Sequence, residues 1–166
     1  MVVSLAYDGL AGELVRRLKY RPEPLLAHPL GARLARQVSE SGILADLVVP
    51  VPLHPSRERE RGFNQAALLS RPVARRLGVA LRERALTRIR PAPPQASLDA
   101  RARARNLHGA FRGKALLRGA RVLLVDDVLT TGHTLAAAAR AAREAGARQV
   151  YAAVVAATVT SPRPAP

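Results

Sequence analysis

The chain has 166 residues, 48% of them hydrophobic, and a formal net charge of +15 from 27 basic and 12 acidic residues. This length and composition predict one folded domain over residues 1–166 and exclude an intrinsically disordered chain. A membrane-spanning helix is excluded because no apolar stretch reaches the roughly 18 residues that it needs. The absence of cysteine excludes disulfides and cysteine-bound zinc. The first residues lack the positive segment of a signal peptide, so we expect a cytoplasmic protein.

The positive charge consists almost wholly of arginine, since Lys19 and Lys114 are the only lysines in the sequence. An excess of this size favours anionic partners, either nucleic acid or phosphorylated small molecules. Arginine suits such partners because its planar guanidinium binds a phosphate through two parallel hydrogen bonds. A genome-wide bias toward Arg, Ala and Pro would produce the same surplus, so charge alone does not decide between these explanations.

Apolar periodicity predicts two helices near the start of the chain, over residues 10–20 and 24–40. The second is expected to begin near Pro29, because proline suits the first position of a helix. A short Val-rich run over 46–53 predicts a buried strand that passes into a loop at its two prolines.

The next segment, residues 63–78, is helical in composition. Gly78 fits a C-terminal cap, and Pro72 predicts a kink or break inside this helix. Residues 80–90 alternate apolar and basic side chains, which predicts a single strand.

The second half of the chain begins with a segment, residues 91–106, that combines Pro, small residues and Arg without an apolar face. It predicts a long flexible loop. Two strands, 121–128 and 149–159, are predicted on either side of a helix over 133–146, and residues 160–166 are expected to be a disordered tail.

Strands alternate with helices along the chain, and the strands are Val-rich. This pattern predicts an α/β fold with a mostly parallel, twisted sheet flanked by helices. Ligands of such sheets bind beyond the carboxyl ends of the strands. The segments after residue 50 and after residue 125 are therefore the two candidate sites.

The most informative stretch is RVLLVDDVLTTGHTLAAAAR, residues 121–140. Its TTGHT segment directly precedes a predicted helix, whose first N–H groups lack internal partners and carry partial positive charge. Gly132 lets the backbone approach a ligand closely, so this loop predicts a phosphate site. The sequence contains neither G-x-x-x-x-G-K-[ST] nor G-x-G-x-x-G, which excludes the Walker and dinucleotide-binding types.

Two adjacent carboxylates, Asp126 and Asp127, precede this loop. Their charge would repel a phosphate, so they need hydrogen-bond donors of another kind. Vicinal hydroxyls supply two donors about a ribose width from a 5-phosphate, which predicts a ribose 5-phosphate ligand. Alternatively, the two aspartates cap the helix or pair with nearby arginines. Because adjacent strand residues point to opposite faces, one of them could be structural.

Four apolar residues, two acids and T-T-G-x-T together resemble the phosphoribosyl diphosphate (PRPP) binding motif of type I phosphoribosyltransferases. The resemblance implies a type I phosphoribosyltransferase-like fold with a small or reduced hood. It also implies that Asp126 and Asp127 hold the ribose 2- and 3-hydroxyls. The residues implied to bind the 5-phosphate are Thr130, Thr131, Gly132, His133 (through its backbone) and Thr134.

Three further blocks are similar to the ComF-like, competence-associated members of this family: VVPVPLHPSRERERGFNQAALLSRPVA, QASLDARARARNLHGAF and YDGLAGELVRRLKY. Together these blocks cover most of residues 7–159, the expected core. Many relatives begin with a cysteine-rich zinc module. This chain contains no cysteine, so we expect no such module here and treat any role tied to it as open.

The resemblance implies transfer of a 5-phosphoribosyl group from PRPP to a nitrogen acceptor, with release of pyrophosphate. The implied pyrophosphate-binding residues are Leu53, His54, Arg57, Arg59 and Arg61. The alternative interpretation of SRERERGF is an exposed charge run that pairs with itself.

The predicted loop would act as a lid through Gln95, Arg103 and Asn106, and Arg103 joins Asp126 and Asp127 as a catalytic candidate. No protein metal cluster is visible, so we expect Mg²⁺ to arrive bound to PRPP.

The acceptor is not identified by the sequence, because no aromatic platform for a base is evident. Two non-enzymatic alternatives therefore stay open. The same fold could act as a binding module in DNA uptake, with single-stranded DNA or competence proteins as partners, or as a PRPP sensor. If the chain assembles, a dimer is the expected form.

Overall fold

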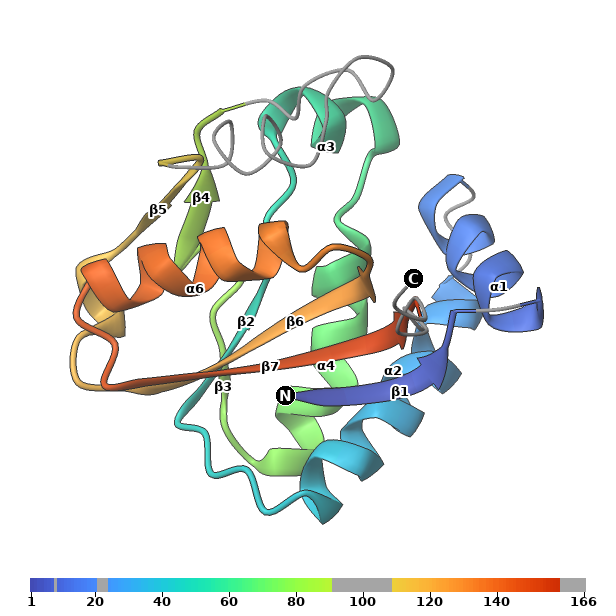
Figure 1. Ribbon diagram of the computed structural model, residues 1–166, viewed down its shortest axis with the longest axis horizontal. Coiled ribbons are helices and arrows are strands. Elements are labelled where there is room, and N and C mark those ends of the chain that lie inside the picture. The colour runs from blue at the N-terminus through green and yellow to red at the C-terminus, as the bar shows by residue number, and fades with distance from the viewer. Residues whose placement is uncertain (8, 21–23, 91–108, 159–166) are drawn as a thin grey trace, which may run out of the picture.

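The computed structural model describes residues 1–7, 9–20, 24–90 and 109–158, and it is built around a five-stranded parallel sheet (Figure 1). The strands lie in the order β1-β7-β6-β2-β3, and each neighbouring pair is parallel. Their bounds are β1 Val2–Ala6, β2 Leu47–Pro50, β3 Ala80–Leu81, β6 Arg121–Leu129 and β7 Gln149–Ala157. The α/β fold with a parallel sheet is confirmed.

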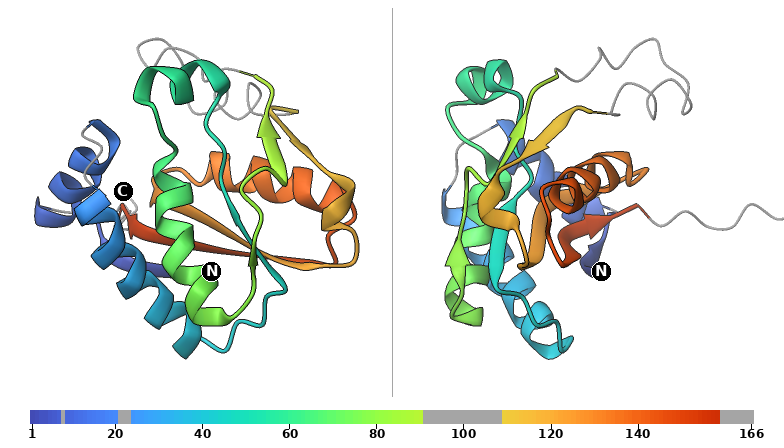
Figure 2. Two further views of the ribbon diagram at one scale, coloured as in Figure 1. Left: turned by 180° about the vertical axis from the view of Figure 1, so that it is seen from behind. Right: turned by 90° about the vertical axis from the view of Figure 1, so that its left-hand side faces the viewer.

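Helices cover both faces of this sheet, and the edge-on view in Figure 2 shows the resulting layers. Helices α2 and α4 pack on one face with α1 beside them, whereas α6 packs on the other face. The helices are α1 Gly9–Tyr20, α2 Pro24–Glu40, α3 Pro55–Arg61, α4 Gln65–Leu77 and α6 His133–Glu144, and a short 3-10 turn spans Ala115–Leu117.

Strand β6 lies in the middle of the sheet and is buried on both sides. Leu123 and Val125 pack toward α2 and α4, whereas Val122 and Leu124 pack toward α6. All four side chains are fully buried. This two-sided burial explains why the strand is a continuous apolar run in the sequence, because polar residues are tolerated only where it ends.

Two helices depart from the predicted boundaries. Helix α2 begins at Pro24, so Pro29 lies inside it and not near its start. Helix α4 continues through Pro72 to Leu77, so of the predicted kink or break, the break does not occur. A Cβ atom on Gly31 would lie 2.9 Å from Pro72 Cγ, which shows how closely α2 packs on the proline ring. The C-terminal cap at Gly78 is confirmed by its φ of 66°.

The single strand predicted over 80–90 is wrong, because the chain changes sheet within it. Strand β3 pairs with β2, and a turn closed by Ala85 N–H donating to the Arg82 carbonyl follows. Strand β4 (Leu86–Arg88) then pairs antiparallel with β5 (Phe111–Gly113) in a separate two-stranded sheet. Strand β1 was not predicted, since it is short and lies at the edge of the sheet.

The predicted flexible loop over 91–106, with Gln95, Arg103 and Asn106, lies outside the described residues, as does the predicted tail over 160–166. Within the described ranges, no helix is both long enough and apolar enough to cross a membrane.

Candidate functional site

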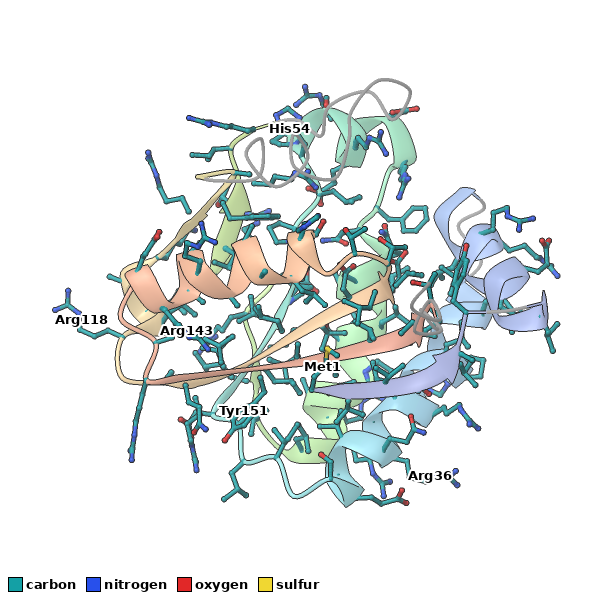
Figure 3. All side chains as sticks on the ribbon, in the orientation of Figure 1. Met1, Arg36, His54, Arg118, Arg143 and Tyr151 are labelled. Atoms are coloured by element: carbon teal, nitrogen blue, oxygen red, sulfur yellow. The ribbon has the colours of Figure 1, made fainter. Side chains whose placement is uncertain are left out.

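A cavity of about 280 Å³ lies at the carboxyl ends of β2 and β6. It brings together the two candidate segments of the sequence, since Leu53 and His54 follow β2 while Asp126 and Asp127 lie near the end of β6. Helix α3 and the first residue of α4 complete one wall, and Figure 3 shows His54 at the start of α3. This position is where ligands of parallel sheets bind.

The two aspartates are buried, with relative exposures of 9% for Asp126 and 4% for Asp127. Asp126 Oδ1 accepts from the Asp127 backbone N–H at 2.9 Å, and Asp127 Oδ1 accepts from the Val128 N–H at 2.7 Å. The side-chain amide of Gln65 donates to Asp127 Oδ2 at 3.3 Å. Buried carboxylates need such donors, and these bonds hold both groups at the cavity wall.

The segment between β6 and α6 forms a compact loop around a hollow of about 20 Å³. Gly132 caps α6 with a φ of 75°, in the left-handed region that favours glycine. Thr130 and Thr134 line both this hollow and the larger cavity, so the two spaces adjoin. The His133 Nδ1 atom is buried and has no hydrogen-bond partner in the described part of the chain.

Thr158 anchors this loop from the end of β7. Its N–H donates to the Leu129 carbonyl at 2.9 Å, and its hydroxyl donates to the Thr130 carbonyl at 3.3 Å. The contact joins residues far apart in the sequence, so no local pattern could have revealed it. It fixes the backbone at the entry to the loop.

The cavity wall that carries Arg57 and Arg61 is the helix α3, although the sequence predicted a loop there. Arg57 and Arg61 are half-buried and line the cavity, because residues four apart share one face of α3. Arg59 is exposed and does not line it. His54 caps the helix by accepting from the Ser56 N–H at 3.3 Å. The Ser56 N–H therefore already has a partner in the structure.

Arg88 also lines the cavity. Sequence reasoning counted it only among the eight arginines of residues 81–112 and gave it no individual role. Its guanidinium lies 5.4 Å from the centroid of the Phe111 ring, and its Nε donates to the Arg90 carbonyl at 3.2 Å. Burial and the neighbouring charge of Arg57 lower the pKa of Arg88, while Asp126 acts in the opposite direction. Nothing in the local pattern TRIR marks this residue as functional. Gln65 lay inside a recognised block, but that block assigned it no role.

Among the described residues, no three His, Cys, Asp or Glu side chains are grouped to hold a metal ion. The carboxylates of Asp126 and Asp127 could supply one or two ligands at most. This donor set fits Mg²⁺ that brings phosphate oxygens and water as its remaining ligands.

Comparisons with known proteins agree with this geometry. A family model described as "Phosphoribosyl transferase domain" matches residues 62–164. The chain is 39% identical over 142 residues to the DNA utilization protein YhgH of Salmonella typhi, covering 82% of this chain and 63% of that protein. It is 36% identical over 158 residues to Competence protein F of Haemophilus influenzae, covering 90% and 69%. The chain thus spans less than two thirds of the length of the Salmonella relative.

A solved structure of glutamine phosphoribosylpyrophosphate amidotransferase from B. subtilis shares the fold. The TM-score is 0.61 at 20% identity, over 90% of this chain and 32% of that one. The chain therefore belongs to the phosphoribosyltransferase domain family, with the type I fold and the ComF-like relatives that its sequence predicted.

Proposed function

We propose that the chain binds PRPP in the cavity between β6 and α3. The observation that carries this proposal is the set of groups gathered around one cavity. Asp126 and Asp127 line it together with Thr130 and Thr134 of the loop and with Arg57 and Arg61 of α3. In this pose the ribose hydroxyls donate to the carboxylates, the loop N–H groups bind the 5-phosphate, and the arginines bind the diphosphate.

The reaction that suits this arrangement is transfer of the 5-phosphoribosyl group to a nitrogen acceptor. The bond between ribose C1 and the diphosphate oxygen breaks, and the acceptor nitrogen forms the new bond to C1. The transition state has oxocarbenium character, so nearby carboxylates stabilise its positive charge while arginines stabilise the leaving diphosphate. Bound Mg²⁺ would further neutralise the diphosphate. Arg103 remains a proposed participant.

Transferase activity is tested by measuring pyrophosphate release from PRPP across a panel of purine and pyrimidine bases and simple amines. We expect release with at least one acceptor for the wild-type chain and none for the Asp126→Asn/Asp127→Asn variant. Equal release by both proteins would contradict the proposal. PRPP binding without release for any acceptor would instead favour the sensor alternative.

A second candidate function is DNA binding. It is favoured by the net charge of +15 and by the names of the relatives, DNA utilization protein YhgH and Competence protein F. In that role, affinity for a single-stranded oligonucleotide would fall steeply with salt concentration, because bound phosphates release counterions. Fluorescence anisotropy at 50 and 200 mM salt, with and without PRPP, distinguishes the two functions. Affinity indifferent to salt would count against this candidate.

A further inference from the structure

Arg88 occupies a junction that the proposed PRPP pose leaves unassigned. It lines the 280 Å³ cavity and also a neighbouring cavity of about 430 Å³. The two spaces share Pro52, Leu53 and Arg88 among their lining residues. Arg88 therefore lies where the two cavities meet, on β4 of the small sheet, whereas Arg57 approaches from α3.

The side chain of Arg88 is held in place before any ligand binds. Phe111 lies directly opposite Arg88 in the β4–β5 pairing and is 4% exposed, so its ring is a rigid support for the guanidinium. The Nε hydrogen bond to the Arg90 carbonyl fixes the plane of the group further. The terminal Nη atoms make no hydrogen bond within the described residues. A preorganised guanidinium whose remaining donors have no partner among the described residues loses little conformational freedom when it binds an anion.

Arg57 and Arg88 are two of the three arginines that line this cavity, and Arg61 is the third. Neither Arg57 nor Arg88 forms an ion pair with any described residue. Both guanidinium groups line one cavity, and the pKa of Arg88 is lowered by burial and by the charge of Arg57. Asp126 lines the same cavity and acts on the pKa of Arg88 in the opposite direction. An anion with two negative centres would relieve this repulsion.

We infer that Arg88 is a diphosphate-binding residue and forms with Arg57 a two-guanidinium clamp, supported by Phe111. Each guanidinium offers paired N–H donors that match the oxygens of one phosphoryl group. The inference rests on the proposed function for the source of the diphosphate, which is the leaving group of PRPP. Free pyrophosphate offers the same chemistry, so the two sources are tested separately.

The experiment measures calorimetric affinity for pyrophosphate and, separately, for ribose 5-phosphate. The variants are Arg88→Gln, Arg88→Lys and the control Arg112→Gln. Arg112 lies next to Phe111 on β5 but is exposed and lines neither cavity. Loss of a bidentate, charge-assisted contact should weaken pyrophosphate binding about tenfold or more in Arg88→Gln. Arg88→Lys keeps the positive charge but lacks the paired N–H donors of the guanidinium. Its loss of pyrophosphate affinity should therefore be smaller than that of Arg88→Gln. Ribose 5-phosphate affinity should be unchanged throughout.

The outcomes separate this inference from the proposed function. If Arg88→Gln and Arg112→Gln bind pyrophosphate equally while wild-type protein binds PRPP, the clamp is wrong and the proposed function stands. If pyrophosphate binding depends on Arg88 but neither PRPP nor ribose 5-phosphate binds, the clamp stands and the PRPP proposal fails. If folded wild-type protein binds none of the three ligands, both are wrong. Thermal unfolding of each variant shows whether it is folded. If Arg88→Gln does not fold, the pyrophosphate affinity of Arg88→Lys is compared with that of wild type, and equal affinities would contradict the clamp.

Discussion

Gln65 and Asp127 are joined by a hydrogen bond of 3.3 Å between the side-chain amide and the carboxylate, across 62 positions of sequence. The other end of the amide accepts from Arg61 at 3.3 Å, so Gln65 connects α3, α4 and β6. Its 4% exposure means that the amide is held rigidly between its partners. The cavity therefore has one buried residue that sets the position of a carboxylate relative to the arginine-bearing helix.

Replacing Gln65 with Leu should weaken PRPP binding about tenfold, because Asp127 loses a donor and a hydrogen bond to a charged group is worth roughly 1.5–3 kcal/mol. Titration calorimetry measures the change. Gln37→Leu is the control, since that glutamine lies on α2 and does not line the cavity. Identical affinities for the two variants would show that the Gln65 amide does not position the carboxylate.

Replacing Gly132 with Ala should weaken ribose 5-phosphate binding, because φ of 75° strains any residue with a Cβ by about 1 kcal/mol and shifts the loop backbone. The added Cβ would also lie 3.4 Å from Leu129 Cδ1. Gly78→Ala is the matched control, with φ of 66° and nothing within 4 Å of the new Cβ. Both variants should lower the melting temperature, but only Gly132→Ala should lower the affinity. Equal ribose 5-phosphate affinity in the two variants would show that the loop is not part of the binding site.

The arrangement of β6 and the loop after it was predictable because it is local. Asp126, Asp127 and the Thr-rich loop lie next to one another in sequence, so the end of a buried strand and the start of a helix fix their relationship. The prediction that Arg59 binds pyrophosphate together with Arg57 and Arg61 assumed a loop after β2. The segment is instead the helix α3, which places Arg57 and Arg61 on the cavity and Arg59 outside it.

The contacts of Arg88 and Gln65 could not be predicted, because each depends on where a distant segment packs. Arg88 enters the site only because the chain leaves the main sheet after β3 and pairs with β5. Alternating apolar and basic residues over 80–90 fit one long strand equally well. This alternation indicates β-strand structure, but it does not indicate which sheet the strand joins.

Two matched substitutions on α3, Arg57→Gln and Arg59→Gln, test which of its arginines bind pyrophosphate. Arg57→Gln should weaken pyrophosphate binding about tenfold, since this half-buried guanidinium lines the cavity. Arg59→Gln should change it less than about twofold, because an exposed charge outside the cavity is largely screened. Calorimetry at fixed ionic strength measures both. Equal losses would mean that only net charge matters.

The acid sensitivity of the fold should depend partly on Asp46, whose carboxylate joins β2 to β6. Hydrogen bonds from the Arg121 side chain and N–H lower the pKa of Asp46 from 3.8 to about 2. The folded state thus binds fewer protons than the unfolded state between these values. The contribution of Asp46 to stability is present above pH of about 4 and is lost as pH falls toward 2.

Melting temperatures from pH 6 to pH 2 for wild type and Asp46→Asn measure this effect. The gap between the two proteins should be constant above about pH 4.5 and close toward pH 2. Glu40→Gln is the control, because the 3.8 Å pair of Glu40 with Arg36 is exposed and weak. A gap that persists unchanged at pH 2 would show that the Arg121 bonds do not perturb this carboxyl.

The central claim is that the paired aspartates hold the ribose of PRPP, and calorimetric titration with PRPP in the presence of Mg²⁺ tests it most directly. Wild-type protein should bind, and the Asp126→Asn/Asp127→Asn variant should lose measurable binding while its circular dichroism spectrum and melting behaviour show an intact fold. Undiminished PRPP affinity in that folded double variant, or no binding by folded wild-type protein, would contradict the account.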